Sequence, residues 1–215
     1  MYKIILGVTV IMAEVYYIGG SPCIGKSTIA EMLAKKYGFQ HFKQDDFLEE
    51  YINKGVHEGY ELFKKVSLMS KDEMWMRSPR ELRDEEIFLY KIMFSYSVND
   101  IMALPQGNSI IAEGAGFMPG LVKGINIDKF YYICIVPTKD FQVNMYSKRA
   151  WVSDYLSDCS DPDTVFKNWM ERDTLFAETV LQEASDLGYM SLIADGVKSI
   201  EENRAAVEKA FRLRI

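Results

Sequence analysis

The stretch Gly20-Ser21-Pro22-Cys23-Ile24-Gly25-Lys26-Ser27 fits the pattern G-x-x-x-x-G-K-[ST] of a phosphate-binding loop. Glycines let the backbone curl so that successive N–H groups point at phosphate oxygens. A helix that begins near Lys26 adds its positive end to the same site. We therefore predict that the loop, with Thr28 behind it, binds nucleotide phosphates, that Lys26 contacts the outer phosphates and that Ser27 is a ligand of Mg²⁺.

The residues on either side of the loop have the pattern that the motif requires. Residues 14–19 are a β-rich run. Ile29, Met32 and Leu33 follow the loop with helical spacing, and Gly38 is a plausible helix end. Strand, glycine-rich loop and helix together form the structural setting that supports a phosphate loop.

Four further apolar runs have the length and composition of strands, namely residues 39–43, 109–112, 130–136 and 189–194. The run 130–136 is continuously apolar, which is typical of a strand that is buried on both faces. Helical patterns separate these runs. Five strands that alternate with helices predict an α/β domain with a doubly wound, five-stranded parallel sheet.

Capping signals mark where the helices begin and end. Ser78-Pro79 opens a long helix within residues 46–104, a mostly helical region, and Pro137-Thr138 opens another. Asp161-Pro162 begins a helix that runs to about Leu187, with Gly188 as its end. Ser199 and Glu202 fit a capping box at the start of the last helix.

Composition limits the possible partners. The 215 residues are enough for one α/β domain, and a net charge of −6 without a basic stripe argues against a nucleic-acid partner. Cys23, Cys134 and Cys159 lie far apart, which predicts reduced thiols and a cytoplasmic protein. The apolar run 4–12 is too short to span a membrane. Residues 1–13 form an N-terminal extension whose role stays open: either residues 1–11 lie upstream of a true start at Met12, or they form an edge strand.

The order of these features resembles the P-loop small-molecule kinases, which include nucleoside, shikimate, gluconate and antibiotic phosphotransferases of the P-loop NTPase superfamily. Besides the phosphate loop, Gln44-Asp45-Asp46-Phe47 after the second strand and Glu113-Gly114 after the third carry the resemblance. It implies a nucleoside-kinase-like domain over residues 14–215. Residues 46–104 are then a helical insert that binds the acceptor, and residues 148–172 are a lid.

The resemblance also implies roles for single residues. Asp45 faces the acceptor hydroxyl as its base or orienting carboxylate, with helix capping as the alternative for Asp45 or Asp46. Glu113 holds the substrate or a Mg²⁺-bound water, unless it belongs to a surface turn. Asp195 lies in the loop that contacts adenine, and a plain turn is equally plausible there.

Arginines of the lid and of the insert complete the predicted site. The resemblance implies that Arg149 and Arg172 close on the ATP phosphates. The alternative is that both are ordinary solvated charges on helices. No arginine lies between Lys26 and Arg77, which favours a neutral hydroxyl acceptor. If Arg77 turns inward as a substrate-binding residue, the acceptor is anionic.

These features predict an ATP- and Mg²⁺-dependent enzyme that transfers the γ-phosphoryl group to a hydroxyl of a small molecule. One alternative is a nucleoside monophosphate kinase, whose acceptor is anionic. A second is a regulatory nucleotide-binding ATPase that acts through a protein partner. The identity of the acceptor, the oligomeric state and the pathway stay open.

Overall fold

The computed structural model describes residues 2–5, 8–11, 13–22, 25–105 and 107–213, of which 2–5 and 8–11 are described by their backbone alone. Five parallel strands form the central sheet in the order β4-β5-β3-β6-β7. Their bounds are β3 Val15–Gly20, β4 Gln40–Lys43, β5 Ile110–Glu113, β6 Tyr132–Pro137 and β7 Met190–Ala194. The predicted five-stranded parallel sheet is confirmed.

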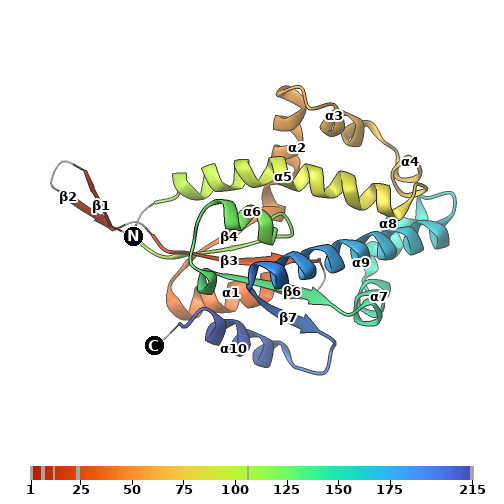
Figure 1. Ribbon diagram of the computed structural model, residues 1–215. Helices are drawn as coiled ribbons and strands as arrows, with labels where there is room; N and C mark the ends of the chain where they lie inside the picture. The colour runs from red at the N-terminus through yellow and green to blue at the C-terminus, as the bar shows by residue number, and fades with distance from the viewer. Residues whose placement is uncertain (1, 6–7, 12, 23–24, 106, 214–215) are drawn as a thin grey trace.

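Helices cover both faces of the sheet (Figure 1). One face carries α1 (Lys26–Tyr37) and α10 (Ile200–Ala210), and the other carries α5 (Pro79–Ala103), α6 (Pro119–Gly124) and α9 (Pro162–Leu187). Alternate strand residues supply the two cores, since Tyr16 packs with the first face and its neighbour Tyr17 with the second. Burial on both faces explains why the strands are continuously apolar.

Three short helices and α5 make up the region 46–104, which is helical as predicted. A 3-10 turn, η1 (Gln44–Phe47), leads from β4 into α2 (Leu48–His57), α3 (Glu61–Leu68) and α4 (Lys71–Trp75). These helices lie above the sheet beside α5 (Figure 1). A separate apolar cluster of Tyr51, Phe63, Met93 and Tyr96 packs α2 and α3 against α5, whereas Trp75 of α4 belongs to another cluster.

The chain between β6 and α9 contains two helices, α7 (Lys139–Ser147) and α8 (Ala150–Ser157). The sequence pattern did not predict α8. A short 3-10 turn, η2 (Lys129–Tyr131), precedes β6, so this strand begins at Tyr132 and not at residue 130. The expected start was too early because the aromatic residues 130 and 131 have strand-like composition.

The predicted helix ends are confirmed where capping signals marked them. Ser199 and Glu202 form a reciprocal capping box at the start of α10. The Asp161 carboxylate accepts a hydrogen bond from the Thr164 N–H at 3.1 Å. Gly38 and Gly188 end α1 and α9 with left-handed backbone angles, which glycine adopts without steric cost.

The N-terminal residues form a small sheet of their own. Strands β1 (Tyr2–Ile5) and β2 (Val8–Ile11) pair antiparallel with each other and not with the five-stranded sheet. The alternative of an edge strand on the main sheet is therefore wrong, because these strands satisfy their backbone groups mutually.

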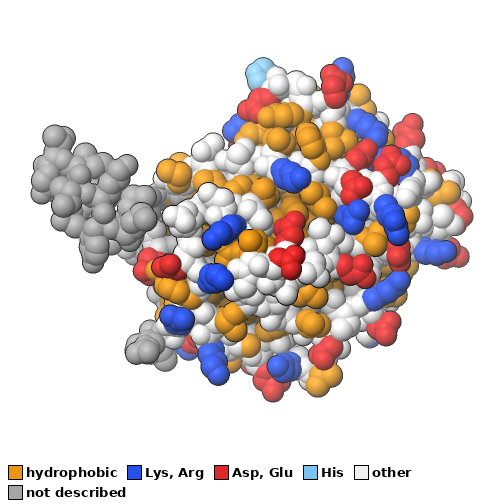
Figure 2. Space-filling view, in the orientation of Figure 1, with side chains coloured by type: hydrophobic (Ala, Val, Ile, Leu, Met, Phe, Trp, Pro, Cys, Tyr) orange, Lys and Arg blue, Asp and Glu red, His pale blue; other side chains and the backbone are white. Residues whose placement is uncertain are grey.

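No helix of the described chain is long and apolar enough to cross a bilayer. Acidic and basic side chains are interspersed over the face drawn in Figure 2.

Candidate active site

The phosphate loop joins the end of β3 to the start of α1. Gly20 has φ 112°, and a Cβ atom there would lie 1.8 Å from the Ile135 carbonyl oxygen. Gly25 caps α1 with φ 78°. Only glycine suits either position. Cys23 and Ile24 lie outside the described residues, so their predicted phosphate contacts stay predictions.

Lys26, the lysine of the phosphate loop, is buried, with 7% of its surface exposed. Its Nζ donates a hydrogen bond to the Ser21 carbonyl oxygen at 2.7 Å. The Ser21 hydroxyl in turn lies 3.5 Å from the Asp173 carbonyl oxygen of α9. Ser21 therefore connects the loop to α9, and the ammonium of Lys26 is held inside the loop.

Glu113 lies at the end of β5 beside this loop. Its side chain is 1% exposed, and Oε1 has no hydrogen-bond partner among the described residues. Burial raises the pKa of Glu113, whereas the charge of Lys26 and a hydrogen bond with Ser27 lower it. A carboxylate oxygen without a partner, next to a hydroxyl and an ammonium, fits a site that awaits a cation or a hydrogen-bond donor.

Asp45 is exposed in the turn η1, directly after β4. Its buried neighbour Gln44 anchors this turn: Nε2 donates to the Ser97 hydroxyl at 2.9 Å, and Oε1 accepts from the Gly116 N–H at 2.8 Å. A Cβ atom on Gly116 would lie 2.4 Å from Gln44 Oε1, so the glycine leaves room for this anchor. Gln44 was not predicted as a site residue, although Gly114 and Gly116 in one loop were a signal for a close approach.

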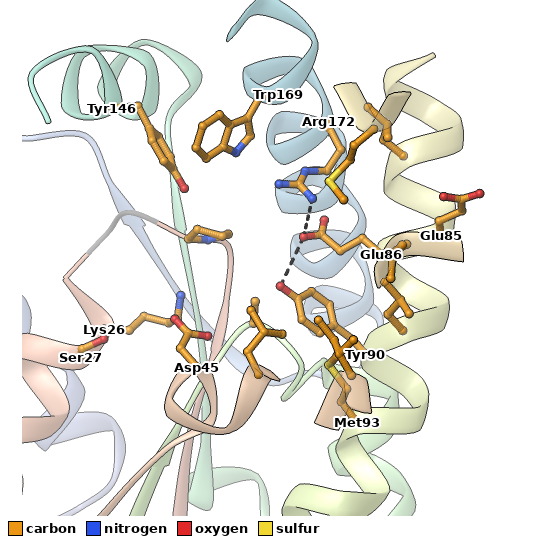
Figure 3. Close-up of a pocket in the computed structure, with 18 of the residues that line it drawn as sticks. Lys26, Ser27, Asp45, Glu85, Glu86, Tyr90, Met93, Tyr146, Trp169 and Arg172 are labelled. Carbon is orange, nitrogen blue, oxygen red and sulfur yellow. Dashed lines mark hydrogen bonds and ion pairs between the residues drawn. The ribbon is translucent and has the colours of Figure 1, made fainter. Parts of the chain in front are cut away.

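One cavity of about 700 Å³ brings most of the predicted residues together (Figure 3). The phosphate loop and α1 line one end of it, and the helical insert lines the other. The predicted residues in its wall are Pro22, Gly25, Lys26, Ser27, Thr28, Asp45, Arg77, Glu113, Arg149 and Arg172. Asp195 is not among them. Its Oδ1 accepts a hydrogen bond from the Val197 N–H at 2.9 Å, as in a plain turn.

Arg172 lies in a buried ion cluster between α5 and α9. Its side chain is 15% exposed, one guanidinium nitrogen lies 2.7 Å from Glu86 Oε1, and Nε lies 2.5 Å from Asp173 Oδ1. The guanidinium also stacks 4.9 Å from the Trp75 ring centroid. The alternative of a solvated helix charge is therefore wrong for Arg172, because two carboxylates and a ring surround it. Its predicted contact with ATP stays a prediction.

The two remaining arginines of the wall also have local partners. Arg77 donates to the Met74 carbonyl oxygen at 3.1 Å and forms ion pairs with Glu81 at 2.9 Å and Glu85 at 2.8 Å. The Arg149 guanidinium lies 5.3 Å from the Tyr146 ring centroid. Arg77 therefore turns inward, as one prediction required, yet two carboxylates already share its charge.

The sequence is 27% identical over 139 residues to the 2-phosphoglycerate kinase of Thermococcus kodakarensis, and the match covers 62% of this chain and 47% of that protein. The resemblance to the P-loop small-molecule kinases is confirmed. The chain spans about half the length of this curated relative. No protein-family model matches the chain.

One solved structure shares the fold of this chain at low sequence identity. The crystal structure of TT1252 from Thermus thermophilus has a TM-score of 0.52 and 15% identity, covering 95% of this chain and 100% of that one. A shikimate kinase from Bacteroides thetaiotaomicron has a TM-score of 0.46 and 13% identity, covering 93% of this chain and 99% of that one. The first of these similarities shows a common fold and nothing more.

In this P-loop kinase-like chain, the predicted lid 148–172 comprises α8 and the first part of α9, and it contacts the insert at α4. Lys71 Nζ lies 2.8 Å from Asp158 Oδ2, and Trp75 Nε1 donates to the Tyr155 hydroxyl at 2.8 Å. The Ser160 N–H donates to Asp72 at 3.0 Å. The two segments between which an acceptor would enter are thus joined by these polar contacts and by a buried apolar cluster that includes Trp75, Val152 and Trp169.

Nucleotide binding should slow amide exchange in residues 148–172. Closure over ATP would bring Arg149 or Arg172 toward the γ-phosphate and exclude water from the cavity. We expect fast exchange in the free protein and slow exchange with a non-hydrolysable ATP analogue and Mg²⁺, measured by mass spectrometry. Peptides of α10 serve as the control. Protection of 148–172 that does not change on addition of nucleotide would contradict a lid.

Replacement of Arg172 by methionine should lower the free energy of unfolding by about 3–5 kcal/mol, because two buried carboxylates would lose their shared cation. Urea denaturation followed by circular dichroism measures this change. Arg83→Met is the matched control, since Arg83 pairs with the exposed Asp84 and should cost less than about 1 kcal/mol. An equally small loss for both variants would contradict a structural role of Arg172.

Burial raises the pKa of Glu86 from its ordinary value of 4.5 to about 7, although Arg172 opposes this shift. Folding therefore favours the protonated carboxyl, and the stability that this gives is complete below pH 4.5 and is lost as the pH rises toward 7. We expect Glu86→Gln to reduce the fall in unfolding free energy between pH 4.5 and 8 by about 2–3 kcal/mol. Parallel pH profiles of the two proteins would contradict this assignment.

Proposed function

We propose that the protein is an ATP- and Mg²⁺-dependent phosphotransferase that moves the γ-phosphoryl group of ATP to a hydroxyl of a small molecule. One observation carries this proposal: a single cavity contains Lys26 and Ser27 of the phosphate loop, the Asp45 carboxylate and the side chains of the helical insert. Donor, candidate base and acceptor pocket thus share one space. Phosphoryl transfer needs this proximity more than it needs covalent chemistry by the protein.

The residues present fit a nucleotide-bound Mg²⁺. Ser27 offers a hydroxyl, and the buried Glu113 offers a carboxylate oxygen that has no partner in the described chain. The described residues contain no group of three or more His, Cys, Asp or Glu that would hold a metal ion alone. Ser27 would be a direct ligand, Glu113 would hold a metal-bound water, and the nucleotide phosphates would supply further oxygen ligands. When bound, Mg²⁺ neutralises charge on the transferring phosphoryl group.

Residues of the chain itself would orient the acceptor, take its proton and stabilise the charge on the phosphates. The acceptor oxygen forms a bond to the γ-phosphorus, the bond from that phosphorus to the β–γ bridging oxygen breaks, and ADP leaves. Asp45 orients the acceptor hydroxyl and receives its proton. Lys26 stabilises the charge on the β- and γ-phosphates, and Arg149, which also lines the cavity, would support it.

The acceptor end of the cavity favours a molecule without a phosphate of its own. Arg77 and Arg172, the arginines nearest the insert, are each shared between two carboxylates. Apolar side chains make up much of the remaining wall, and they include Leu48, Ile52, Val66, Leu82, Leu89 and Met93. An acceptor that presents a hydroxyl on an apolar body and carries no anionic group suits this surface.

A second candidate is an acceptor that carries an anion. It is favoured by the name of the relative, a 2-phosphoglycerate kinase, and by the inward position of Arg77. An acceptor phosphate would have to displace Glu81 or Glu85 from Arg77. This competition makes the anionic acceptor the weaker of the two proposals.

A screen of ATP consumption tests both. The purified protein, ATP and Mg²⁺ are incubated with nucleosides, sugars, alcohols, antibiotics, nucleoside monophosphates and 2-phosphoglycerate, and products are identified by mass spectrometry. Phosphorylation of an alcohol that carries no anionic group supports the first proposal, and phosphorylation of an anion supports the second. ATP binding without transfer to any acceptor, together with a partner-dependent ATPase, would support a regulatory protein instead.

A further inference from the structure

The wall of the cavity contains one carboxylate oxygen that the described protein does not satisfy. Glu86 Oε1 accepts hydrogen bonds from Arg172 at 2.7 Å and from the Tyr90 hydroxyl at 3.3 Å. Glu86 Oε2 is buried and has no partner among the described residues. In Figure 3 the Glu86 side chain points from α5 into the cavity, toward the side on which Lys26 and Asp45 lie, whereas Glu85 points away.

In the buried cluster around Glu86 two carboxylates share one guanidinium, and the charge of Lys26 and a hydrogen bond with the Tyr146 side chain also act on Asp173. Arg172 is shared between Glu86 and Asp173, and the Asp173 side chain is 1% exposed. One guanidinium thus faces two carboxylates. A buried charge without a full partner is costly, so a ligand that supplies a positive group would be favoured here. Burial raises the pKa of Glu86 to about 7; the charge of Arg172 opposes this shift and the charge of Asp173 adds to it.

At the acceptor end, Arg77, Lys65 and Lys43 have carboxylates of their own, whereas the Arg149 guanidinium in the cavity wall lies against the Tyr146 and Trp151 rings. Glu81 and Glu85 hold Arg77, and Glu85 also holds Lys65 at 2.5 Å. Lys43 pairs with Asp46 at 3.1 Å. An acceptor anion would therefore compete with protein carboxylates, whereas an acceptor cation would meet an unsatisfied oxygen.

The surroundings of Glu86 define the rest of the ligand. Glu86, Leu89, Tyr90 and Met93 lie three, four and seven residues apart and line the cavity along one face of α5. The Trp75 and Trp169 rings also line the cavity, and they stack with centroids 5.1 Å apart. This wall is apolar and aromatic with a single inward carboxylate, which suits an apolar or aromatic body that carries one positive group.

We propose that Glu86 determines specificity for an acceptor that carries an ammonium group. Its Oε2 accepts a hydrogen bond from the ammonium, the apolar body of the acceptor packs along α5, and the hydroxyl of the acceptor faces Asp45. The acceptor class is thus an amino alcohol with an apolar body. This inference rests on the proposed phosphotransferase activity and names the substrate class of the same site.

Matched pairs of ligands test the proposal. Phenylalaninol and leucinol are compared with their N-acetyl derivatives, which keep the hydroxyl and the body but lose the charge, and phenyllactate serves as an anionic analogue. Affinities are measured calorimetrically with the wild-type protein saturated with a non-hydrolysable ATP analogue and Mg²⁺. We expect each amine to bind at least tenfold more tightly than its N-acetyl derivative, and phenyllactate to bind more weakly than phenylalaninol.

Two variants connect the preference to Glu86. Glu86→Gln keeps the shape of the side chain and should remove the preference for the amine, while affinity for the ATP analogue is unchanged. Asp84→Asn removes an exposed carboxylate from the same helix, outside the cavity, and should retain the preference. Circular dichroism checks folding. If Glu86→Gln does not fold, the comparison of ligands with the wild-type protein decides alone.

Several results would overturn the amine proposal. These are equal or tighter binding of the N-acetyl derivatives or of phenyllactate, retention of the preference in folded Glu86→Gln, or no amine bound at millimolar concentration by a protein that binds the ATP analogue. Failure to bind the ATP analogue would instead contradict the proposed phosphotransferase. Phosphorylation of an uncharged alcohol in preference to its amine analogue would keep that function and reject the amine.

Discussion

Replacement of Lys26 by alanine should reduce phosphoryl transfer by about 10²–10³ and leave the fold intact. In the protein without nucleotide, the ammonium is bound to the Ser21 carbonyl oxygen at 2.7 Å, so it is already placed within the loop. With ATP bound, it would bridge the β- and γ-phosphates and stabilise the charge that moves during transfer. Loss of one positioned electrostatic group of this kind typically costs about 10²–10³ in rate. Release of ADP in the presence of acceptor measures the effect.

Lys35→Ala is the matched control for this experiment. Lys35 lies on the same helix α1, but it is exposed and does not line the cavity. We expect this variant to keep the rate of the wild-type protein. Thermal denaturation should be nearly the same for both variants, because Lys26 contributes its charge to the loop and not to an apolar core. Turnover near the wild-type rate in Lys26→Ala would contradict the phosphate-loop assignment.

Asp45→Asn should reduce transfer to the acceptor by about 10²–10⁴ while changing nucleotide affinity little. The substitution keeps the shape of the side chain and removes its capacity to take a proton. Gln44 holds the turn through Ser97 and Gly116, so the turn should keep its position in the variant. Single-turnover phosphorylation of the acceptor and titration with a fluorescent ATP analogue separate the two effects.

Asp46→Asn provides the control for Asp45. The Asp46 side chain is 64% exposed, pairs with Lys43 at 3.1 Å and does not line the cavity. An exposed pair of this kind contributes little to stability, so the variant should be nearly silent. A large loss of transfer in Asp46→Asn without one in Asp45→Asn would mean that the neighbouring carboxylate is the orienting group.

Residues that are close in the chain determined the parts of this protein that the sequence alone predicted. The phosphate loop, the apolar strands, the capping box of Ser199 and Glu202 and the glycine end at Gly188 each depend on a few adjacent residues. Local backbone geometry and side-chain periodicity determine such features, so they can be predicted from adjacent residues of the sequence. The order of strands and helices then predicted the parallel sheet.

Helix α8 is an element that adjacent residues did not predict. Its residues 150–157 mix apolar and polar side chains, and its Val152 and the Tyr155 hydroxyl find their partners in α9 and α4. Tertiary contacts outweigh weak propensity in such a short helix. The position of Gln44 depends in the same way on Ser97 and Gly116, which are distant in sequence.

Only the tertiary structure determined what the acceptor end of the cavity contains. Glu86 and Arg172 are 86 residues apart, and neither has a sequence pattern that distinguishes it from surface helix charge. Folding places them together with Asp173 where water is excluded, and burial then decides which charges are paired and which oxygen is not. The sequence therefore determined where phosphate should bind, whereas the environment of Glu86 exists only after distant helices have packed, because the energy of a buried charge depends on its neighbours in space.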